Sequence, residues 1–283
     1  INHTEILNFN EDTLGMTKII NKEVGGYLGF ENTTLVDNMI FKWSMRLDKN
    51  QNFDFIPTQA FSCIYNLNES HTIRSTFTSA IRNPTLLNQY QYYDVGRAKL
   101  VGNTTGYNNL YTLESIYSYY TQGGNLDSLV SFNLDPIKPE EVKCIEFGYR
   151  GAFKNKLYID ANYYYNWYNN FIGFVTGADI FYDIQDLYIL DVYRVATNSS
   201  RLITTQGFSF GLNYYINNKI TLNGNYSWNK LNKENNDPLV PAYNTPEHKF
   251  NIGISGKEVK IYNTQNIGFN INYKWVEGFI FEG

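Results

Sequence analysis

The side chains best suited to bond chemistry are few and scattered. The three histidines share no metal-ligand spacing: His3, His71 and His248. Ser70 directly precedes His71, and neighbours along a strand point to opposite faces, so they do not form a nucleophile–base pair. Cys63 and Cys144 fit neither a disulfide framework nor a metal motif, and we expect them to stay unbonded. The sequence therefore predicts no enzyme, no cofactor and no metal site.

A second group of candidates consists of charged residues that recur on one side of alternating segments. In segment 39–48, apolar residues such as Phe41 and Trp43 alternate with charged and polar ones. The charged candidates, all expected on one polar face, are Lys42, Arg46, Asp48, Arg74, Arg82, Glu146, Arg150 and Asp160. The favoured interpretation is a solvated wall of cross-strand ion pairs. The alternative is direct contact with a transported substrate.

A third group lies in the tyrosine-rich segment 83–141. Tyrosine offers a large amphipathic contact surface at low entropic cost, which suits ligand recognition. Arg97 and Lys99 look exposed and could bind an anionic chelate. The candidate ligand contacts are Tyr90, Tyr92, Tyr93, Arg97 and Lys99. Equally, the tyrosines could pack this segment upon itself.

The elements that must position these residues follow a period of two, which indicates β-strands. The segments expected to be strands are 23–33, 39–48, 53–65, 73–82, 145–154, 157–168, 206–216, 220–229, 249–255 and 266–275. Their apolar faces are free of charge, and most are long enough to cross a bilayer as tilted strands of about 9–11 residues. We therefore predict an all-β fold, a transmembrane β-barrel portion of about ten strands with antiparallel neighbours throughout.

Connections of two lengths alternate along the chain. Short turns join some segments, and long loops are expected at 83–141, 170–204 and 230–247. Short turns on one side and long loops on the other are typical of outer-membrane barrels.

The chain of 283 residues has 25 Tyr, 19 Phe and a net charge of −4, without a basic patch for nucleic acid. We treat residues 1–283 as part of one barrel domain.

Three stretches carry recognisable motifs. Residues 70–90 contain an Arg-Asn-Pro-Thr run, and in 139–173 a Pro-Glu pair leads into Ile-Glu and Gly-Tyr. Residues 245–256 carry Pro-Glu-His-Lys-Phe-Asn. In their order and spacing these stretches resemble the barrel of TonB-dependent receptors, in the style of Bacteroidetes-type bacteria. The resemblance implies a barrel of 22 strands closed by an N-terminal plug. The plug, the TonB-contacting box, the signal peptide and the final strands are expected outside this chain, whose open edges would be aggregation-prone.

The resemblance also implies a function in the bacterial outer membrane. Energised uptake would bring in a bulky, scarce nutrient such as a metal chelate, cobalamin or a glycan. The implied partners are membrane lipid, the plug, the TonB energy-transducing complex and the ligand. The ion-paired wall would then also hold the plug. A passive porin-like or structural barrel is the alternative, and a soluble β-sandwich binding module is a third. The sequence upstream would separate the first two.

Overall fold

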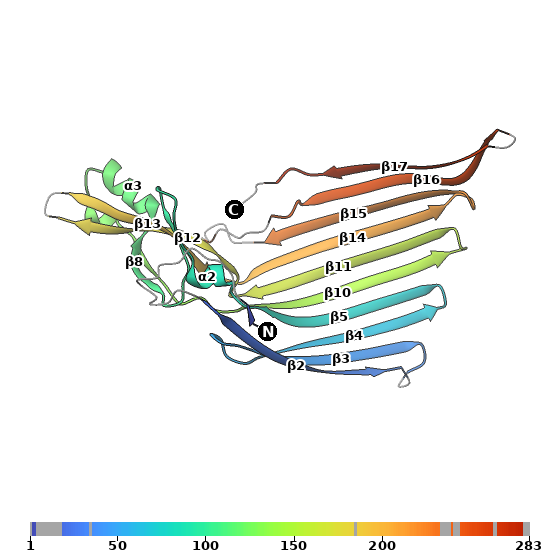
Figure 1. Ribbon diagram of the computed structural model, residues 1–283, viewed down its shortest axis with the longest axis horizontal. Coiled ribbons are helices and arrows are strands. Elements are labelled where there is room, and N and C mark those ends of the chain that lie inside the picture. The colour runs from blue at the N-terminus through green and yellow to red at the C-terminus, as the bar shows by residue number, and fades with distance from the viewer. Residues whose placement is uncertain are drawn as a thin grey trace.

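The chain is described by a computed structural model that covers residues 2–3, 19–33, 36–183, 186–232, 239, 244–262 and 265–279. Its largest part is an eleven-stranded antiparallel sheet, here called the main sheet (Figure 1). In spatial order its strands are β1 (Asn2–His3), β2 (Asn21–Asn32), β3 (Met39–Asn50), β4 (Ile56–Asn68), β5 (His71–Arg82), β10 (Glu140–Phe153), β11 (Leu157–Asn169), β14 (Ile203–Tyr215), β15 (Ile220–Asn232), β16 (His248–Tyr262) and β17 (Gln265–Val276).

The long strands of the main sheet are the ten that the alternation predicts. They run from 12 to 15 residues and pair with their neighbours in antiparallel register. Side chains of directly opposite residues share a face, so one apolar row crosses from Phe30 through Trp43 and Phe61 to Phe77. Pro57 is the second residue of β4, near a strand start, where the missing amide is tolerated.

In the described part of the chain, the apolar side chains on one face of the main sheet are largely exposed. Leu28, Phe30 and Ile271 are 67%, 59% and 64% exposed. Among the described buried hydrophobic residues, only Ile203 belongs to a main-sheet strand. Such a belt of bare apolar side chains suits a lipid environment rather than water. In the part of the chain that is described, no helix is long and apolar enough to span a membrane.

A second sheet of six strands is built from two separate chain segments, in the order β6-β7-β13-β12-β8-β9. Its strands are β6 (Tyr92–Asp94), β7 (Lys99–Val101), β8 (Tyr107–Tyr111), β9 (Ser131–Leu134), β12 (Ile172–Tyr182) and β13 (Leu187–Asn198). Three short helices accompany it, α2 (Leu86–Tyr90), α3 (Leu113–Thr121) and the 3-10 helix η1 (Leu126–Ser128). We call these elements the insert. The expectation of plain loops at 83–141 and 170–204 was therefore wrong.

The insert also contains the one departure from antiparallel pairing among the described strands. Residues 99–101 of β7 pair in parallel with residues 193–195 of β13. The prediction of antiparallel neighbours throughout holds for the main sheet and is wrong at this pair. The predicted loop 230–247 begins with the end of β15, and most of it lies outside the described residues.

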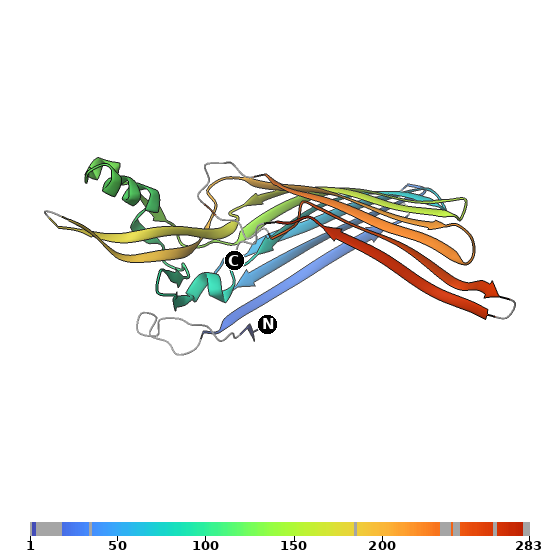
Figure 2. The same ribbon diagram turned by 90° about the horizontal axis from the view of Figure 1, so that it is seen from above.

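The insert projects from one end of the main sheet, and the β3–β4 turn lies at the same end (Figures 1 and 2). Turns such as those of the β4–β5, β10–β11 and β14–β15 hairpins lie at the other end. The insert carries its own hydrophobic core. Ile116 and Tyr119 of α3 pack on Ala178 and Leu187 of the β12–β13 hairpin. Thr112 caps the first turn of α3 by accepting a hydrogen bond from the Ser115 amide. The insert is thus a packed body that the main sheet supports from one end.

Candidate functional site

The polar face of the main sheet carries an ion-paired cluster across three strands. Asp160 on β11 accepts from Arg150 Nε and Nη2 at 2.9 and 2.8 Å, and Arg74 Nη2 lies 3.3 Å from its other oxygen. Arg74 reaches Asp160 by crossing over Gly148, where any Cβ would collide with the arginine. Gly148, the glycine of the Gly-Tyr pair in β10, therefore leaves the space that the Arg74 side chain occupies.

The other predicted wall residues lie on the same face, mostly in pairs. Lys42 contacts Glu31 at 2.9 Å, and Arg46 contacts Asp48 at 2.6 Å. Glu146 stands opposite Thr76 on β5 and Tyr164 on β11. Exposed ion pairs of this kind contribute about 0–1 kcal/mol each. Their geometry accords with a self-paired solvated wall, while direct substrate contact stays a prediction.

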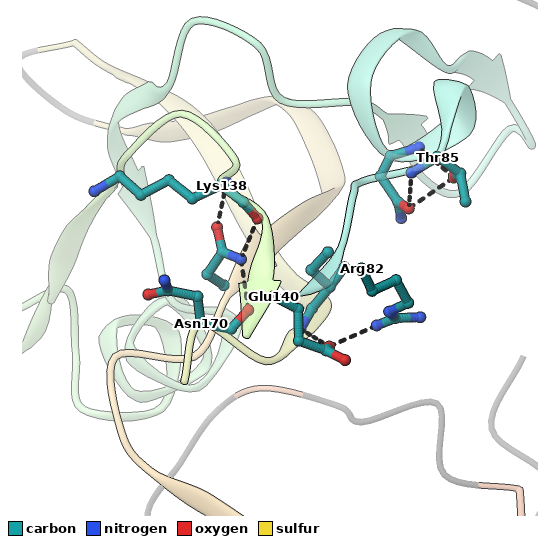
Figure 3. A network of polar contacts seen from close by, with 8 residues as sticks. Arg82, Thr85, Lys138, Glu140 and Asn170 are labelled. Carbon is teal, nitrogen blue, oxygen red and sulfur yellow. Dashed lines mark hydrogen bonds and ion pairs between the residues drawn. The ribbon is translucent and has the colours of Figure 1, made fainter. Parts of the chain in front are cut away.

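Arg82 belongs to a different cluster, at the place where the insert joins the main sheet. Glu140, only 5% exposed, accepts from Arg82 Nη2 at 2.7 Å and from the Ile172 amide at 2.9 Å. Figure 3 shows Glu140 directed toward Arg82. These residues end β5, begin β10 and begin β12. A single buried carboxylate therefore joins the two segments that form the insert.

Asn198, the last residue of β13, completes this junction, which we call the insert root. Its Nδ2 donates to the carbonyl oxygens of Lys138 at 2.9 Å and Asn170 at 2.7 Å, and its Oδ1 accepts from the Lys138 amide at 2.7 Å (Figure 3). Neither Glu140 nor Asn198 stood out in the sequence. The Pro-Glu pair that opens β10 was the one available signal for Glu140.

The predicted ligand residues lie on the β6–β7 hairpin and on α2. Tyr93 is 47% exposed, and Arg97 is exposed in the hairpin turn. Tyr92 packs against Val101, Leu110 and Val195 in the core of the insert. The structure therefore gives the two neighbouring tyrosines different surroundings, one solvated and one half-buried.

Lys99 does not match the expectation of an available cation. Its Nζ lies 2.6 Å from Asp191 Oδ1 and above the Tyr193 ring, 5.9 Å from the centroid. The hydrogen bond between them raises the pKa of Lys99 and lowers the pKa of Asp191. Burial, with the nearby Asp191 carboxylate, raises the pKa of Tyr193 to about 12. Lys99 thus holds β7 beside β13 instead of pointing to solvent.

Tyr90 borders a cavity of about 780 Å³ between the β3–β4 turn and the insert root. Asn52 Nδ2 donates to Tyr90 Oη at 2.7 Å and to Gln89 Oε1 at 2.6 Å, while Gln89 Nε2 donates to the Pro84 carbonyl. Lys138 and acidic residues share the lining. The lining mixes polar and apolar residues and the tyrosine is held in place, which suits contact with a ligand that carries polar groups.

The described residues offer no constellation for bond chemistry. Within the described ranges, no group of three or more His, Cys, Asp or Glu side chains could hold a metal ion. His71 and His248 each lie beside a tyrosine hydroxyl, Tyr149 at 2.7 Å and Tyr226 at 2.8 Å. Both cysteines are free, as predicted.

Comparisons with solved structures agree with this architecture. The siderophore receptor PirA from Acinetobacter baumannii is 13% identical with a TM-score of 0.58, and covers 90% of this chain and 33% of its own. The FrpB iron transporter from Neisseria meningitidis is 13% identical with a TM-score of 0.60, covering 94% and 35%. A mutant of the ferric enterobactin receptor PfeA from Pseudomonas aeruginosa is 14% identical with a TM-score of 0.61, covering 92% and 33%.

This chain thus spans about one third of the length of these structures, and at such identities the likeness concerns the fold. No curated protein matches the sequence. The family model described as "TonB dependent receptor-like, beta-barrel" matches residues 26–279. The chain therefore belongs to the TonB-dependent receptors, a family of bacterial outer-membrane transporters rather than enzymes, and forms part of their β-barrel.

Proposed function

We propose that the protein to which this chain belongs imports a bulky, scarce nutrient across the outer membrane by TonB-linked, energised uptake. The observation that carries the proposal is the packed insert, which rises from one end of a strand wall and is anchored there by Glu140 and Asn198. A passive pore needs no such body. We further propose that residues 1–283 are part of one barrel domain and that a plug and the TonB complex are its partners.

We also propose that metal chelates, cobalamin and glycans are the ligand classes to test. The similar structures are a siderophore receptor, an iron transporter and a ferric enterobactin receptor, which supports starting with iron chelates. The motif style supports a Bacteroidetes-type source. Growth of cells on limiting ligand, with and without the energy-transducing complex, tests the function. Uptake that persists unchanged without that complex would favour the porin-like alternative.

Ligand contact is assigned, within this proposal, to Tyr93, Arg97 and the cavity at Tyr90. Tyr93→Ala should weaken ligand binding by about 1–3 kcal/mol, the usual loss for an aromatic anchor. Tyr92→Ala is the informative comparison, because Tyr92 packs in the insert core and its loss should also loosen the insert. Equal affinity in both variants and the wild type would leave the lumen charges as the better ligand site.

A further inference from the structure

The end of the main sheet that faces away from the insert carries a row of exposed lysines (Figure 1). They lie in or next to three neighbouring hairpin turns, β10–β11, β14–β15 and β16–β17. Backbone hydrogen bonds hold these turns side by side, from the Tyr215 amide to the Lys156 carbonyl at 2.7 Å and from the Lys257 amide to the Lys219 carbonyl at 2.8 Å. We call this row the lysine rim, which consists of Lys154, Lys156, Lys219, Lys257 and Lys260.

The lysine rim has few counter-charges. Glu258 is the one carboxylate within residues 154–156, 217–219 and 257–260, and Lys219 Nζ donates to its backbone carbonyl at 2.7 Å rather than to its side chain. No ion pair among the described residues includes a rim lysine. The β2–β3 and β4–β5 turns at the same end carry the exposed acids Asp37 and Glu69 instead. In a chain of net charge −4, positive charge is thus concentrated along the turns from β10 to β17.

Lys154 occupies a backbone position that does not favour lysine. Its φ is +50°, and φ at the next residue, Asn155, is +53°. This left-handed region is adopted readily by glycine and more easily by asparagine than by other side chains. The other described non-glycine residues with positive φ are asparagines, apart from Glu258. Turn geometry therefore does not explain a lysine at position 154, whereas a role for its charge would.

The last apolar row of the main sheet lies directly beside the lysine rim. Phe153 stands opposite Leu157, and Leu157 stands opposite Tyr214 on the next strand. Phe153 and Tyr214 are each 40% exposed on the apolar face. Aromatic girdles of this kind mark the boundary between hydrocarbon and headgroups, and the short turns of such barrels face the periplasm. The ammonium groups therefore stand at the level of the headgroups of the periplasmic leaflet.

We propose that the lysine rim binds the phosphates of anionic phospholipids in the periplasmic leaflet of the outer membrane. Five strand-to-strand steps separate β10 from β17, so the rim extends over roughly 24 Å and can meet more than one headgroup. An acidic protein of the periplasm would also suit a basic edge, but it would not account for the aromatic row beside the lysines. Bound lipid would fix the depth at which β10–β17 sit in the membrane.

The test uses the full-length receptor, with its plug, in vesicles of equal parts phosphatidylglycerol and phosphatidylcholine. The receptor is extracted in mild detergent, and the lipids that it retains are counted by mass spectrometry. Wild type should retain phosphatidylglycerol in excess over phosphatidylcholine. This excess should shrink as sodium chloride rises from about 0.1 M to 1 M, because the Debye length falls from about 10 Å to 3 Å.

Neutral substitutions separate lipid binding from a structural role of the turns. Lys219 is kept, because it holds the Glu258 carbonyl. The rim variant combines Lys154→Asn, Lys156→Gln, Lys257→Gln and Lys260→Gln. The matched control removes the same charge from exposed lysines at the insert end, with Lys22→Gln, Lys230→Gln, Lys249→Gln and Lys274→Gln. The rim variant should lose the phosphatidylglycerol excess by at least about fivefold, and the control should keep it.

If the rim variant fails to assemble, Lys154→Asn alone provides the test. Asparagine suits the left-handed position, so this variant should assemble at least as well as wild type. Its phosphatidylglycerol excess should nevertheless fall by about twofold. An equal excess in wild type and in the substituted receptor would overturn the proposal and leave an acidic protein as the partner of the turns. A loss of the same size in the control would also overturn it, because total charge rather than position would then determine lipid binding.

Discussion

At the scale of single residues, Glu140 links β5, β10 and β12 at the insert root. Glu140→Ala would leave the Ile172 amide and the Arg82 guanidinium without their acceptor, at a cost of about 1–3 kcal/mol. The insert should loosen where it joins the main sheet, and amide hydrogen exchange should rise at the starts of β10 and β12. Glu141→Ala, at the exposed neighbouring position, is the control. Unchanged exchange in the Glu140 variant would contradict the assigned role.

The Lys99–Asp191 pair makes the insert sensitive to pH at both extremes. The Lys99 hydrogen bond lowers the pKa of Asp191 from its usual value of 3.8. The ionised Asp191 therefore stabilises the fold fully above pH 3.8, and this contribution is lost as the pH falls through the lowered pKa. The hydrogen bond to Asp191 raises the pKa of Lys99 from its usual value of 10.5. The charged Lys99 therefore stabilises the fold fully below pH 10.5, and this contribution is lost as the pH rises through the raised pKa.

Protection of β7 and β13 amides from hydrogen exchange should therefore be flat between about pH 5 and 9 and fall on either side. Asp191→Asn should lower the plateau and weaken both falls. Asp179→Asn serves as control, since Asp179 lies opposite Asp191 in the register and is paired with no lysine among the described ion pairs. A variant profile identical to wild type would show that the pair is incidental.

At the scale of elements, the two faces of a main-sheet strand should respond differently to charge. Phe208→Arg and Ile271→Arg place a cation on the bare apolar face, where it costs about 2–4 kcal/mol near the membrane midplane. Asn213→Arg and Asn270→Arg place it on the polar face and should be milder. Folding yields of the full-length protein, read from heat-dependent gel mobility, measure the difference. Equal yields for the two sets would argue against a lipid-facing surface.

Alternation predicted the main-sheet strands because only one of their faces is apolar. It failed for β12 and β13, which bury adjacent residues such as Val195 and Ala196 on opposite faces, so apolar and polar residues do not alternate along them. Lys99 looked exposed because its partner, Asp191, is distant in sequence and approaches only through a parallel pairing. The role of Glu140 was not predictable for a similar reason, because its burial depends on two separate segments that meet at the insert root.

At the scale of the whole molecule, the main sheet and the insert rest on different interactions. The main sheet relies on strand pairing and a lipid-facing belt, and the insert on its own core. Replacing residues 86–134 and 172–198 together by short turns should leave membrane assembly of the full-length protein intact and abolish ligand binding. Outer-membrane fractionation measures assembly, and titration with the ligand measures binding. Retained affinity would place recognition elsewhere.

The parallel pair between β7 and β13 also constrains the order of events during biogenesis. Neither segment can complete the second sheet alone, because each supplies strands whose partners come from the other. Contacts between such distant segments form slowly, since a long loop must close before they gain stability. The insert can mature only after β10, β11 and the chain through β13 have been delivered to the same side of the membrane. A newly inserted receptor should therefore be unable to bind its ligand for a period after its strands have entered the membrane.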